Sequence, residues 1–526
     1  MNPSPSIWAT LEHRAFRGVW LASGIYFIGN AMQTMAAAWL MVERTGSSFL
    51  AALVQTAVFL PMFLLALPAG VLADTTDRRR LLLVSLAVQA LAVALQALLL
   101  MAGVAGGGTI LLLTFVAGCC TAMLSPAWNS TVGEILPREQ LPQAIVAMSI
   151  AYNAARALGP ALAGLVFALA GAGWVFALAV AGTGVMAMAI VRWPPRQHPP
   201  SRLPAERLWG GTLAGLRYAW HSETILAQLV RTAAFGATGS ALWALLPVIG
   251  QQRLGLGAQG FGALMACLGT GAVAVGLVIG PLRHRVGLDR LVSSCCVVFA
   301  LVMLVSALSR WAVPVYLALV AGGAAWMAAM STFNTATQTS APLWVRSRAT
   351  AMHVLSALGS FALGSAFWGA VAGIAGLQVA LCTAAAGMLG GMLLARRFPL
   401  RMGESQDVTT AVPFEDLLVT DEPDPEAGPV AVELSYRIRA EDAVAFLQSI
   451  EQLRAPRRRD GATLWRVYRD LGDPTRFVER FIVTSWADYL HQRARTTVAD
   501  QELEGQVRAF VVEGVPVTMQ HYIAER

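Results

Sequence analysis

The chain has 526 residues, of which 56% are hydrophobic and only 13% are charged. Soluble domains carry about 25% charged residues, so the excess apolar side chains of this chain have to face lipid. The formal net charge of +7 does not indicate nucleic acid, because from Arg396 to the end 17 arginines stand against 22 acidic residues, whereas the preceding part holds 21 basic and 9 acidic residues. The basic excess belongs to the apolar part, where membrane topology requires it.

Stretches that are long and apolar enough to cross a bilayer recur twelve times. A lipid-spanning helix needs about 20 mostly apolar residues, and the breaks between these stretches hold Pro, Gly or charged residues. The predicted spans lie near residues 17–42, 48–73, 80–102, 109–133, 141–169, 171–191, 228–252, 258–282, 288–308, 312–338, 349–371 and 373–395. The sequence therefore predicts an all-α polytopic membrane protein.

Glycine, acidic and basic residues are gathered in the loop between the second and third spans. Gly70 would let a neighbouring helix approach closely, and Asp74 can lie at the positive N-terminal end of the eleventh span. Arg78 can pair with Glu134, the only acid at the cytoplasmic end of the fourth span. The predicted gating residues are Gly70, Asp74, Asp77, Arg78, Arg80 and Glu134. The alternative is loop charge that only sets topology.

The fifth span contains the run Arg156-Ala-Leu-Gly159-Pro160-Ala-Leu-Ala-Gly164. Its Gly and Pro residues allow close packing and a bend that a rocking helix can use, although a generic packing seam is the alternative. Arg156 is the one basic residue well inside a span, which by default suggests a functional role. It could bind an anionic substrate group, join a polar cluster, or donate to backbone carbonyls near Pro160. The sequence leaves these roles open.

The spans form two sets of six, separated by a Pro-rich, Arg-bearing connection. Four pairs of residues share one offset of 205 positions: Asn129 and Asn334, Pro137 and Pro342, Ala144 and Ala349, Gly159 and Gly364. Similarity at a fixed offset between six-helix halves is typical of transporters built from repeats, which hold the substrate between the halves. We expect transmembrane halves at residues 1–192 and 228–397, joined by a cytoplasmic loop at 193–227.

Beyond the last span the chain becomes polar. Residues 398–429 are predicted to form an acidic tether, because eight acidic residues and no basic residue lie between 404 and 426. Within 430–526, strand-like and helical patterns follow each other in the order βαββαβ. That order predicts a soluble α+β domain with the ferredoxin-like arrangement.

The arginines also predict the orientation in the membrane. With both termini inside, the internal connections hold 17 arginines and the external ones only Arg44, Arg253 and Arg310. The first apolar stretch is too long for a cleavable signal and has no small-residue cleavage site. We expect a multi-pass protein of the bacterial inner membrane with both termini in the cytoplasm.

Two of these motifs carry a family resemblance. The loop Gly70–Arg80 resembles the motif G-x-L-A-D-x-x-x-R-[KR]-x of the major facilitator superfamily. The run at 159–164 resembles its antiporter motif G-P-x-x-G-G, with Ala163 in place of one glycine. The whole chain resembles the transmembrane secretion effector (enterobactin-exporter-like) group through Phe16-Arg17-x-x-Trp20, Gly46-Ser47-Ser48 and Ser125-Pro126-Ala127. The resemblance implies export of siderophores, drugs or secondary metabolites by alternating access.

In a fold of this kind, the first and fourth spans of each half line the substrate cavity. The polar candidates there are Asn30, Gln33, Trp128, Asn129, Trp243, Trp326, Asn334 and Gln338. A lining of Trp, Asn and Gln suits a bulky, partly aromatic solute, although each residue taken singly is more often a polar group in helix packing. No acid lies deep in a span, so the candidates for proton coupling are Glu134 and Glu43, near helix ends, and His353, in the eleventh span. Glu134 and His353 are the preferred pair.

The tail, residues 430–526, is similar to the dimeric α/β-barrel fold of antibiotic-biosynthesis monooxygenases. It has no Cys and only two histidines, His491 and His521, so we expect a dimerisation, regulatory or ligand-sensing module rather than a haem or oxygenase site. No cofactor, metal site or nucleic-acid partner is expected. The expected partners are the small-molecule substrate, the lipid bilayer and a second copy of the tail.

The sequence thus favours secondary active export, coupled to protons, over enzymatic activity. The chain has no G-x-x-x-x-G-K-[ST] loop, which argues against a built-in ATPase. Two alternatives remain: import by the same fold, and a membrane-tethered enzyme or sensor that acts through residues 430–526.

Overall fold

The computed structural model describes residues 12–135, 140–192, 216, 218–276, 278–342, 345–400 and 423–525. The chain divides into two compact units. The first consists of Met1–Arg202, Arg231–Thr332 and Val354–Arg397, and the second of Leu203–Val230, Phe333–His353 and Phe398–Arg526. Most of the helical bundle lies in the first unit and the β-sheet in the second.

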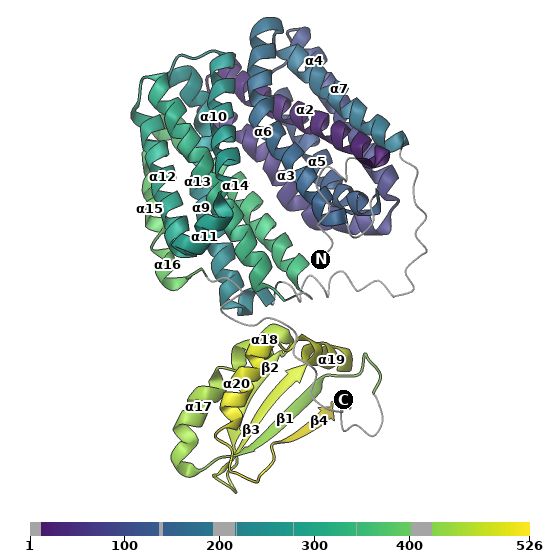
Figure 1. The fold of residues 1–526 in the computed structure, drawn as a ribbon, viewed down its shortest axis with the longest axis vertical. Coiled ribbons are helices and arrows are strands. Elements are labelled where there is room, and N and C mark those ends of the chain that lie inside the picture. The colour runs from purple at the N-terminus through teal and green to yellow at the C-terminus, as the bar shows by residue number, and fades with distance from the viewer. Residues whose placement is uncertain are drawn as a thin grey trace. The chain divides into compact units, whose positions relative to one another are not determined.

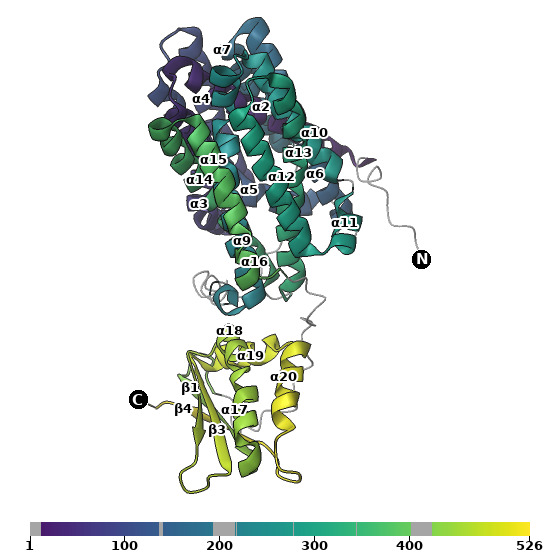
Figure 2. The same ribbon diagram turned by 90° about the vertical axis from the view of Figure 1, so that its left-hand side faces the viewer.

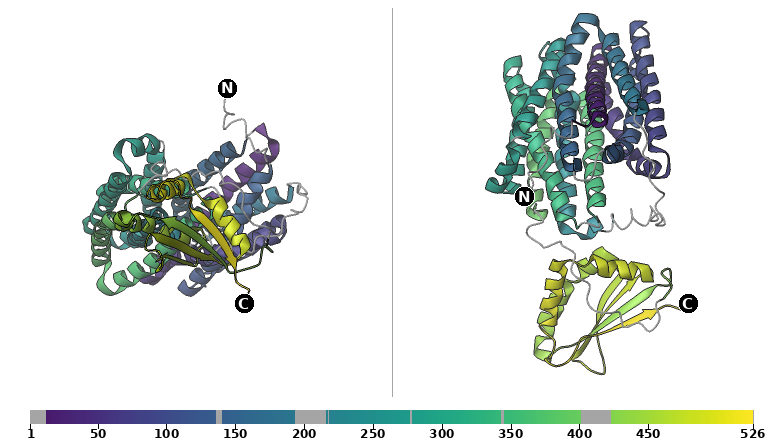
Figure 3. Two further views of the ribbon diagram at one scale, coloured as in Figure 1. Left: turned by 90° about the horizontal axis from the view of Figure 1, so that it is seen from below. Right: turned by 45° about the vertical axis from the view of Figure 1, so that its right-hand side comes forward.

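Twelve helices in the described ranges are long and apolar enough to cross a membrane, which confirms the predicted number of spans. The first six are α2 (Arg14–Thr45), α3 (Ser48–Thr75), α4 (Arg78–Met101), α5 (Gly107–Ile135), α6 (Leu141–Ala170) and α7 (Ala172–Arg192). The last six are α9 (Glu223–Val248), α10 (Ala258–Gly276), α12 (Leu288–Leu308), α13 (Ala312–Ser340), α14 (Arg346–Ala375) and α15 (Leu377–Gly391), whose span continues to Arg397. They run side by side (Figures 1 and 3). The short helices are η2 (Ile249–Arg253), which extends α9 as a π-helical turn, α11 (Ile279–Val286) and α16 (Leu394–Arg397).

The boundary between α2 and α3 shows why the chain breaks where it does. Gly46 ends α2 with φ of 63°, a left-handed conformation that glycine adopts without strain. Ser47 then begins α3 by accepting a hydrogen bond from the Leu50 amide at 3.3 Å. The break therefore consists of a glycine C-cap followed directly by a serine N-cap.

The first six helices pack around α2, which contacts α3, α5, α6 and α7. A buried cluster at the end where α2 begins includes Phe16, Leu82 and Trp128. The polar Gln89 is buried nearby and accepts a hydrogen bond from Tyr26 Oη at 3.0 Å, which satisfies both groups. Large apolar side chains such as Leu91 remain exposed on the other helix faces, as lipid-facing residues do.

The sheet of the second unit has four antiparallel strands in the order β2-β3-β1-β4. The strands are β1 (Val430–Arg437), β2 (Leu464–Arg469), β3 (Arg476–Val483) and β4 (Thr518–Ile523). The 3-10 turn η4 (Ala440–Asp442), α17 (Ala443–Glu451) and α18 (Arg454–Asp460) join β1 to β2, and α19 (Trp486–Arg495) and α20 (Val498–Arg508) join β3 to β4. Along the chain these elements follow the predicted βαββαβ order.

The helices cover one face of this sheet (Figure 2). Along β1, Val430, Val432 and Leu434 are buried beneath them, whereas Ala431 and Glu433 on the opposite face are half-exposed. This alternation follows from the two-residue period of a strand. The sheet therefore has one face packed into its own core and one open face.

Candidate functional site

The first six helices meet the last six at the end where α2 finishes and α3 begins. Gly46 O accepts a hydrogen bond from Gln252 Nε2 at 2.9 Å, and the rings of Trp39 and Phe261 stack with centroids 5.5 Å apart. On α14, a Cβ added at Gly369 would lie 2.4 Å from Ala52 Cβ of α3. Three different helix pairs thus close the bundle at this end.

The glycine-proline run of α6 packs against two helices. A Cβ at Gly159 would lie 2.6 Å from Ala31 Cβ of α2, and one at Gly164 would lie 2.7 Å from Ala258 O of α10. The Pro160 carbonyl faces α10 as well, because its oxygen lies 2.6 Å from the Cβ position of Gly262. The run therefore holds α6 between α2 and α10, one helix from each set of six.

Arg156 lies one turn before this run, on the α6 surface that faces α9. Its guanidinium carbon is 5.6 Å from the ring centroid of Trp243 on α9 and 6.0 Å from that of Tyr152 on α6. Both Arg156 and Tyr152 are nevertheless exposed. Arg156 therefore remains accessible at the level where it contacts the opposite set of helices.

An aromatic cluster lies beside Arg156 in the second set of helices. The rings of Trp243 and Trp326 make an edge contact at 5.8 Å. Trp326 is also surrounded by Phe235 at 5.3 Å, Phe299 at 5.6 Å and Phe361 at 5.7 Å. Trp243 Nε1 is buried and has no hydrogen-bond partner in the described part of the chain. The structure thus brings two of the predicted cavity residues, Trp243 and Trp326, together with Arg156.

The other predicted cavity residues lie in several places. Gln33 is buried in α2 and Asn30 is half-buried on the same helix, while Trp128 belongs to the buried cluster with Phe16 and Leu82. In the second unit, Gln338 Nε2 donates to Asn334 Oδ1 at 3.0 Å. The side chain of Asn129 lies outside the described residues. A role in substrate binding stays a prediction for all of them.

The predicted gating loop has one clear structural feature. Asp77 is the N-cap of α4, where its Oδ1 accepts from the amides of Arg79 at 2.9 Å and Arg80 at 3.3 Å. The Arg80 side chain is exposed, and Arg79 Nη2 donates to Val191 O of α7 at 2.5 Å. These contacts fix the start of α4 and tie it to the end of α7.

The remaining gating contacts stay predictions. A Cβ at Gly70 would meet no atom of the described residues within 4 Å, so none of them makes a close helix contact there in this conformation. The side chains of Asp74 and Glu134 lie outside the described residues. The predicted pairing of Arg78 with Glu134 therefore lies outside them as well. His353, the other candidate for proton coupling, is buried in α14.

The second set of helices contains an ion pair that the count of loop charges in the sequence did not predict. Arg231 of α9 pairs with Asp289 in the first turn of α12, and the Arg231 side chain is only 4% exposed. Nearby, Arg283 of α11 donates to Thr332 Oγ1 of α13 at 3.1 Å. Counting loop charges treats Arg231 and Arg283 as topology signals, whereas the structure shows that both tie helices together.

The second unit contains a buried polar network. Glu479 of β3 is fully buried and accepts from Tyr436 Oη at 2.8 Å, Trp465 Nε1 at 2.9 Å and Arg457 Nε at 3.1 Å. Arg457 also pairs with Glu504 at 2.8 Å. Charge-assisted hydrogen bonds of this kind are stronger than neutral ones, so the network fixes α18 and α20 against the sheet.

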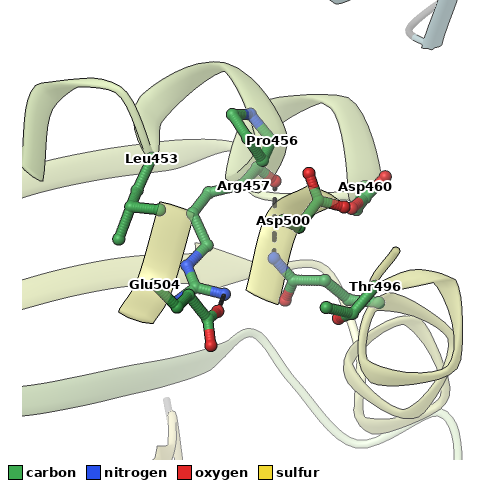
Figure 4. Close-up of a pocket in the computed structure, with 8 residues that line it drawn as sticks. Leu453, Pro456, Arg457, Asp460, Thr496, Asp500 and Glu504 are labelled. Carbon is green, nitrogen blue, oxygen red and sulfur yellow. Dashed lines mark hydrogen bonds and ion pairs between the residues drawn. The ribbon is translucent and has the colours of Figure 1, made fainter. Parts of the chain in front are cut away.

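A small pocket lies beside this network (Figure 4). Its lining residues are Leu453, Pro456, Arg457, Asp460, Gln492, Thr496, Asp500 and Glu504. All four charged groups are paired: Arg457 with Glu504, and Asp460 and Asp500 each with Arg459. Within the described residues, no three His, Cys, Asp or Glu side chains are grouped so as to hold a metal ion. The pocket therefore offers paired charges rather than a set of free ligands.

Arg459 joins the tail to residues that precede α9 in the same unit. Its guanidinium carbon lies 5.6 Å from the ring centroid of Tyr218. Tyr218 is buried in a cluster with Ile225 and Val345. Burial raises the pKa of Tyr218 to about 12, although the Arg459 charge acts in the opposite direction. Tyr218 is thus a neutral ring beneath a cation, an arrangement that is attractive.

Comparison of sequences assigns the chain to a known family. The profile of the family described as transmembrane secretion effectors matches residues 5–526. The multidrug efflux pump Tap of Mycobacterium tuberculosis is 28% identical over 269 residues, which cover 48% of this chain and 63% of that relative. The enterobactin exporter EntS of Shigella flexneri is 26% identical over 389 residues, which cover 73% of this chain and 90% of that relative. The match to Tap therefore spans less than two thirds of its length.

Solved transporter structures share the fold. The nucleoside transporter NupG superposes with a TM-score of 0.60 at 12% identity, over 74% of this chain and 100% of that one. A bacterial homologue of the human lysosomal transporter Spinster superposes with a TM-score of 0.55 at 14% identity, over 73% of this chain and 94% of that one. At such identities the likeness concerns the fold alone.

Proposed function

The chain belongs to the transmembrane secretion effector family of the major facilitator superfamily, and from this premise we propose that it exports a small molecule from the cytoplasm by alternating access. The relatives named as efflux pump and exporter support this direction. A siderophore, drug or secondary metabolite is the proposed class of cargo. The proposed location is the bacterial inner membrane.

The closed end of the bundle is the observation that carries the proposal. The contacts of Gly46 with Gln252 and of Gly164 with α10 join the two sets of helices at one end. Deeper in the bundle, Arg156 contacts the opposite set and remains exposed. If both termini are cytoplasmic, the closed end faces outward and Arg156 is reached from the cytoplasm. A carrier in this state is ready to take up its cargo for export.

We further propose that the two sets of six helices are structural repeats that rock against each other. The fixed offset of 205 residues supports this reading, because it pairs Gly159 with Gly364. Both glycines lie at close helix contacts, Gly159 against α2 and Gly364 against α9, where a Cβ would be 2.5 Å from Ala237 O. Repeats of this kind move as rigid bodies around a central site.

Proton coupling is the proposed source of energy. The candidates are Glu134 and His353. The buried position of His353 supports it as a group whose protonation depends on conformation. A His353→Asn variant that exports at the wild-type rate and remains sensitive to the proton gradient would leave Glu134 as the candidate.

For the tail we propose a ferredoxin-like regulatory or dimerising module. Support comes from the strand order β2-β3-β1-β4 and from the open face of the sheet, which a second copy would cover. The Tyr218–Arg459 contact gives the module a connection to residues just before α9. Such a connection would let the state of the tail bias the transport cycle.

Transport in everted membrane vesicles tests the proposal. Vesicles with the wild-type protein are energised and given a panel of siderophores, dyes and antibiotics, and accumulation is measured with and without a protonophore. The proposal predicts accumulation of one compound class that collapses with the proton gradient. Vesicles carrying Asp74→Asn should accumulate less, and vesicles carrying Arg290→Gln, a change at an exposed position in the first turn of α12, should match the wild type. Accumulation only in right-side-out vesicles would show an importer and contradict the proposed direction.

A further inference from the structure

We propose that the cargo is an organic anion with an aromatic ring, and that Arg156 and the indole N–H of Trp243 bind its anionic group between the two sets of helices. This inference rests on the proposed function, because it takes the space between the sets as the transport path. It adds the chemical class of the cargo and the residues that select it.

The first reason is that Arg156 has no counter-ion among the residues that the structure describes. The residue lies near the middle of the α6 span, Ala147–Ala170, where a charge is costly and normally paired. Its contacts in the described part of the chain are the rings of Tyr152 and Trp243, and no acidic side chain there pairs with it. A guanidinium offers five donors in a planar fork that suits a carboxylate or a similar anion. The missing partner is therefore supplied by the cargo.

The second reason is that a second hydrogen-bond donor, the indole N–H of Trp243, lies beside Arg156. Trp243 Nε1 is buried and has no acceptor among the described residues, and a buried donor without a partner destabilises a structure unless another state satisfies it. The same indole ring lies beneath the Arg156 guanidinium. An anion that draws the guanidinium from the ring face meets the N–H at the ring edge as its second donor. Two donors from opposite sets of helices then converge on one anionic group.

The third reason is the aromatic surface around these donors. On the α6 side of the proposed site, Tyr152 is 48% exposed and makes an edge contact with Phe27 at 5.3 Å. On the other side, Trp243 and Trp326 are only partly buried and form an edge pair. Aromatic rings bind one another in edge and offset arrangements. A ring attached to the anion is therefore bound between Tyr152 and the two tryptophans.

Binding of an anion also has a consequence for the transport cycle. Closure of the two sets around an empty site would bury the Arg156 charge without a partner, which is strongly unfavourable. A bound anion neutralises the guanidinium and removes that barrier. Arg156 thus makes closure depend on an anionic cargo, so a neutral analogue of the same shape binds weakly and is poorly exported.

Equilibrium dialysis with the purified full-length protein in nanodiscs tests the inference. The probes are 1-naphthoate, its neutral isostere 1-naphthamide, and cyclohexanecarboxylate as an anion without an aromatic ring. Wild type should bind 1-naphthoate roughly 10- to 100-fold more tightly than 1-naphthamide, as the loss of a charge-assisted hydrogen bond implies. It should bind 1-naphthoate about 2- to 10-fold more tightly than cyclohexanecarboxylate, which keeps the charge but lacks the aromatic ring contacts. Equal affinity for the acid and the amide, or no binding of 1-naphthoate, would overturn the inference without any variant.

The variants locate the site. Arg156→Gln should abolish the preference for the acid over the amide, Arg156→Lys should retain most of it, and Trp243→Phe should weaken 1-naphthoate binding about tenfold while keeping the aromatic surface. Arg253→Gln, in which a cation is removed at the closed end, should bind like the wild type. An unchanged acid preference in Arg156→Gln would overturn the assignment.

The binding assay and the transport assay test the two proposals separately. Dialysis needs no gradient, so anion selectivity without export in vesicles would contradict the proposed function alone. Export of neutral or cationic compounds, with no selectivity for 1-naphthoate, would contradict this inference alone.

Discussion

Gly164 of α6 and Gly262 of α10 lie so close that neither position has room for a side chain. A Cβ on Gly164 would lie 3.2 Å from the Gly262 Cα and 2.7 Å from Ala258 O. A Cβ on Gly262 would lie 3.2 Å from the Gly164 Cα and 2.6 Å from Pro160 O. Because the obstructing atoms belong to the backbone, no side-chain rearrangement relieves the contact, and the seam between the two sets of helices depends on both glycines.

Gly164→Ala and Gly262→Ala should therefore weaken the closed end of the bundle. Overpacking of a close contact costs about 1–3 kcal/mol, and here this energy favours separation of α6 from α10. We expect slower export in everted vesicles and faster amide hydrogen exchange at the later half of α6. Gly184→Ala on α7 is the matched control, because a Cβ there would meet no atom within 4 Å. Wild-type export in both seam variants would show that the cycle does not require this contact.

Asp74→Asn and Arg78→Ala should lower transport while the protein stays folded in the membrane. Asp74 is expected to interact with a helix N-terminus and Arg78 with Glu134, so each change removes a contact that holds the cytoplasmic end closed. If the coupling lies in the usual range of about 1–3 kcal/mol, export falls by at least about fivefold. The checks are initial rates in vesicles and the melting temperature in detergent. Full transport in both variants would leave the loop with a role in topology only.

Asp77 has a structural role that separates it from its neighbours in the loop. Asp77→Ala removes the N-cap of α4 and should cost about 1 kcal/mol, because the amides of Arg79 and Arg80 lose their acceptor. Asp77→Ser can cap the helix without a charge and should restore stability. Thermal unfolding of the two variants measures the difference. If Asp77→Ser is as unstable as Asp77→Ala, the carboxylate acts through its charge and not as a cap.

The sequence was most informative where a single physical requirement dominates. Burial in lipid requires long apolar helices, so the twelve spans follow from composition and spacing alone. Arg156 stood out for the same reason, as a charge where lipid should exclude one. Tertiary partners leave no such local signal: nothing in the sequence around Arg231 indicates Asp289, 58 positions later. Likewise, Trp128 and Trp243 look equivalent in sequence, yet Trp128 packs in a buried cluster and Trp243 contacts Arg156 of the other set of helices.

Glu479 should be the most sensitive position of the tail. Glu479→Ala leaves Arg457 without one of its two carboxylate partners and leaves the hydroxyl of Tyr436 and the indole N–H of Trp465 without their acceptor. Breaking a buried charge pair typically costs about 3–5 kcal/mol. Urea unfolding of the full-length protein, followed by hydrogen exchange at β1 and β3, should show early loss of the tail while the helices remain protected. The exposed Glu513→Gln serves as a control, and an equally stable Glu479→Ala would mean that the network contributes nothing net.

Acid should destabilise the tail through Asp500. Burial alone would raise the pKa of Asp500, but Arg459 and the hydrogen bonds from Thr497 outweigh burial and hold the pKa below its ordinary value. A carboxyl whose pKa is lowered by folding contributes stability that is present above its unfolded pKa of about 3.9 and is lost as the pH falls through the folded value. Hydrogen-exchange protection of α20 should therefore be constant between neutral pH and about pH 5 and fall below about pH 4. Asp500→Asn should lower protection at neutral pH and flatten this dependence; an acid transition of unchanged depth in Asp500→Asn would assign it to another carboxyl.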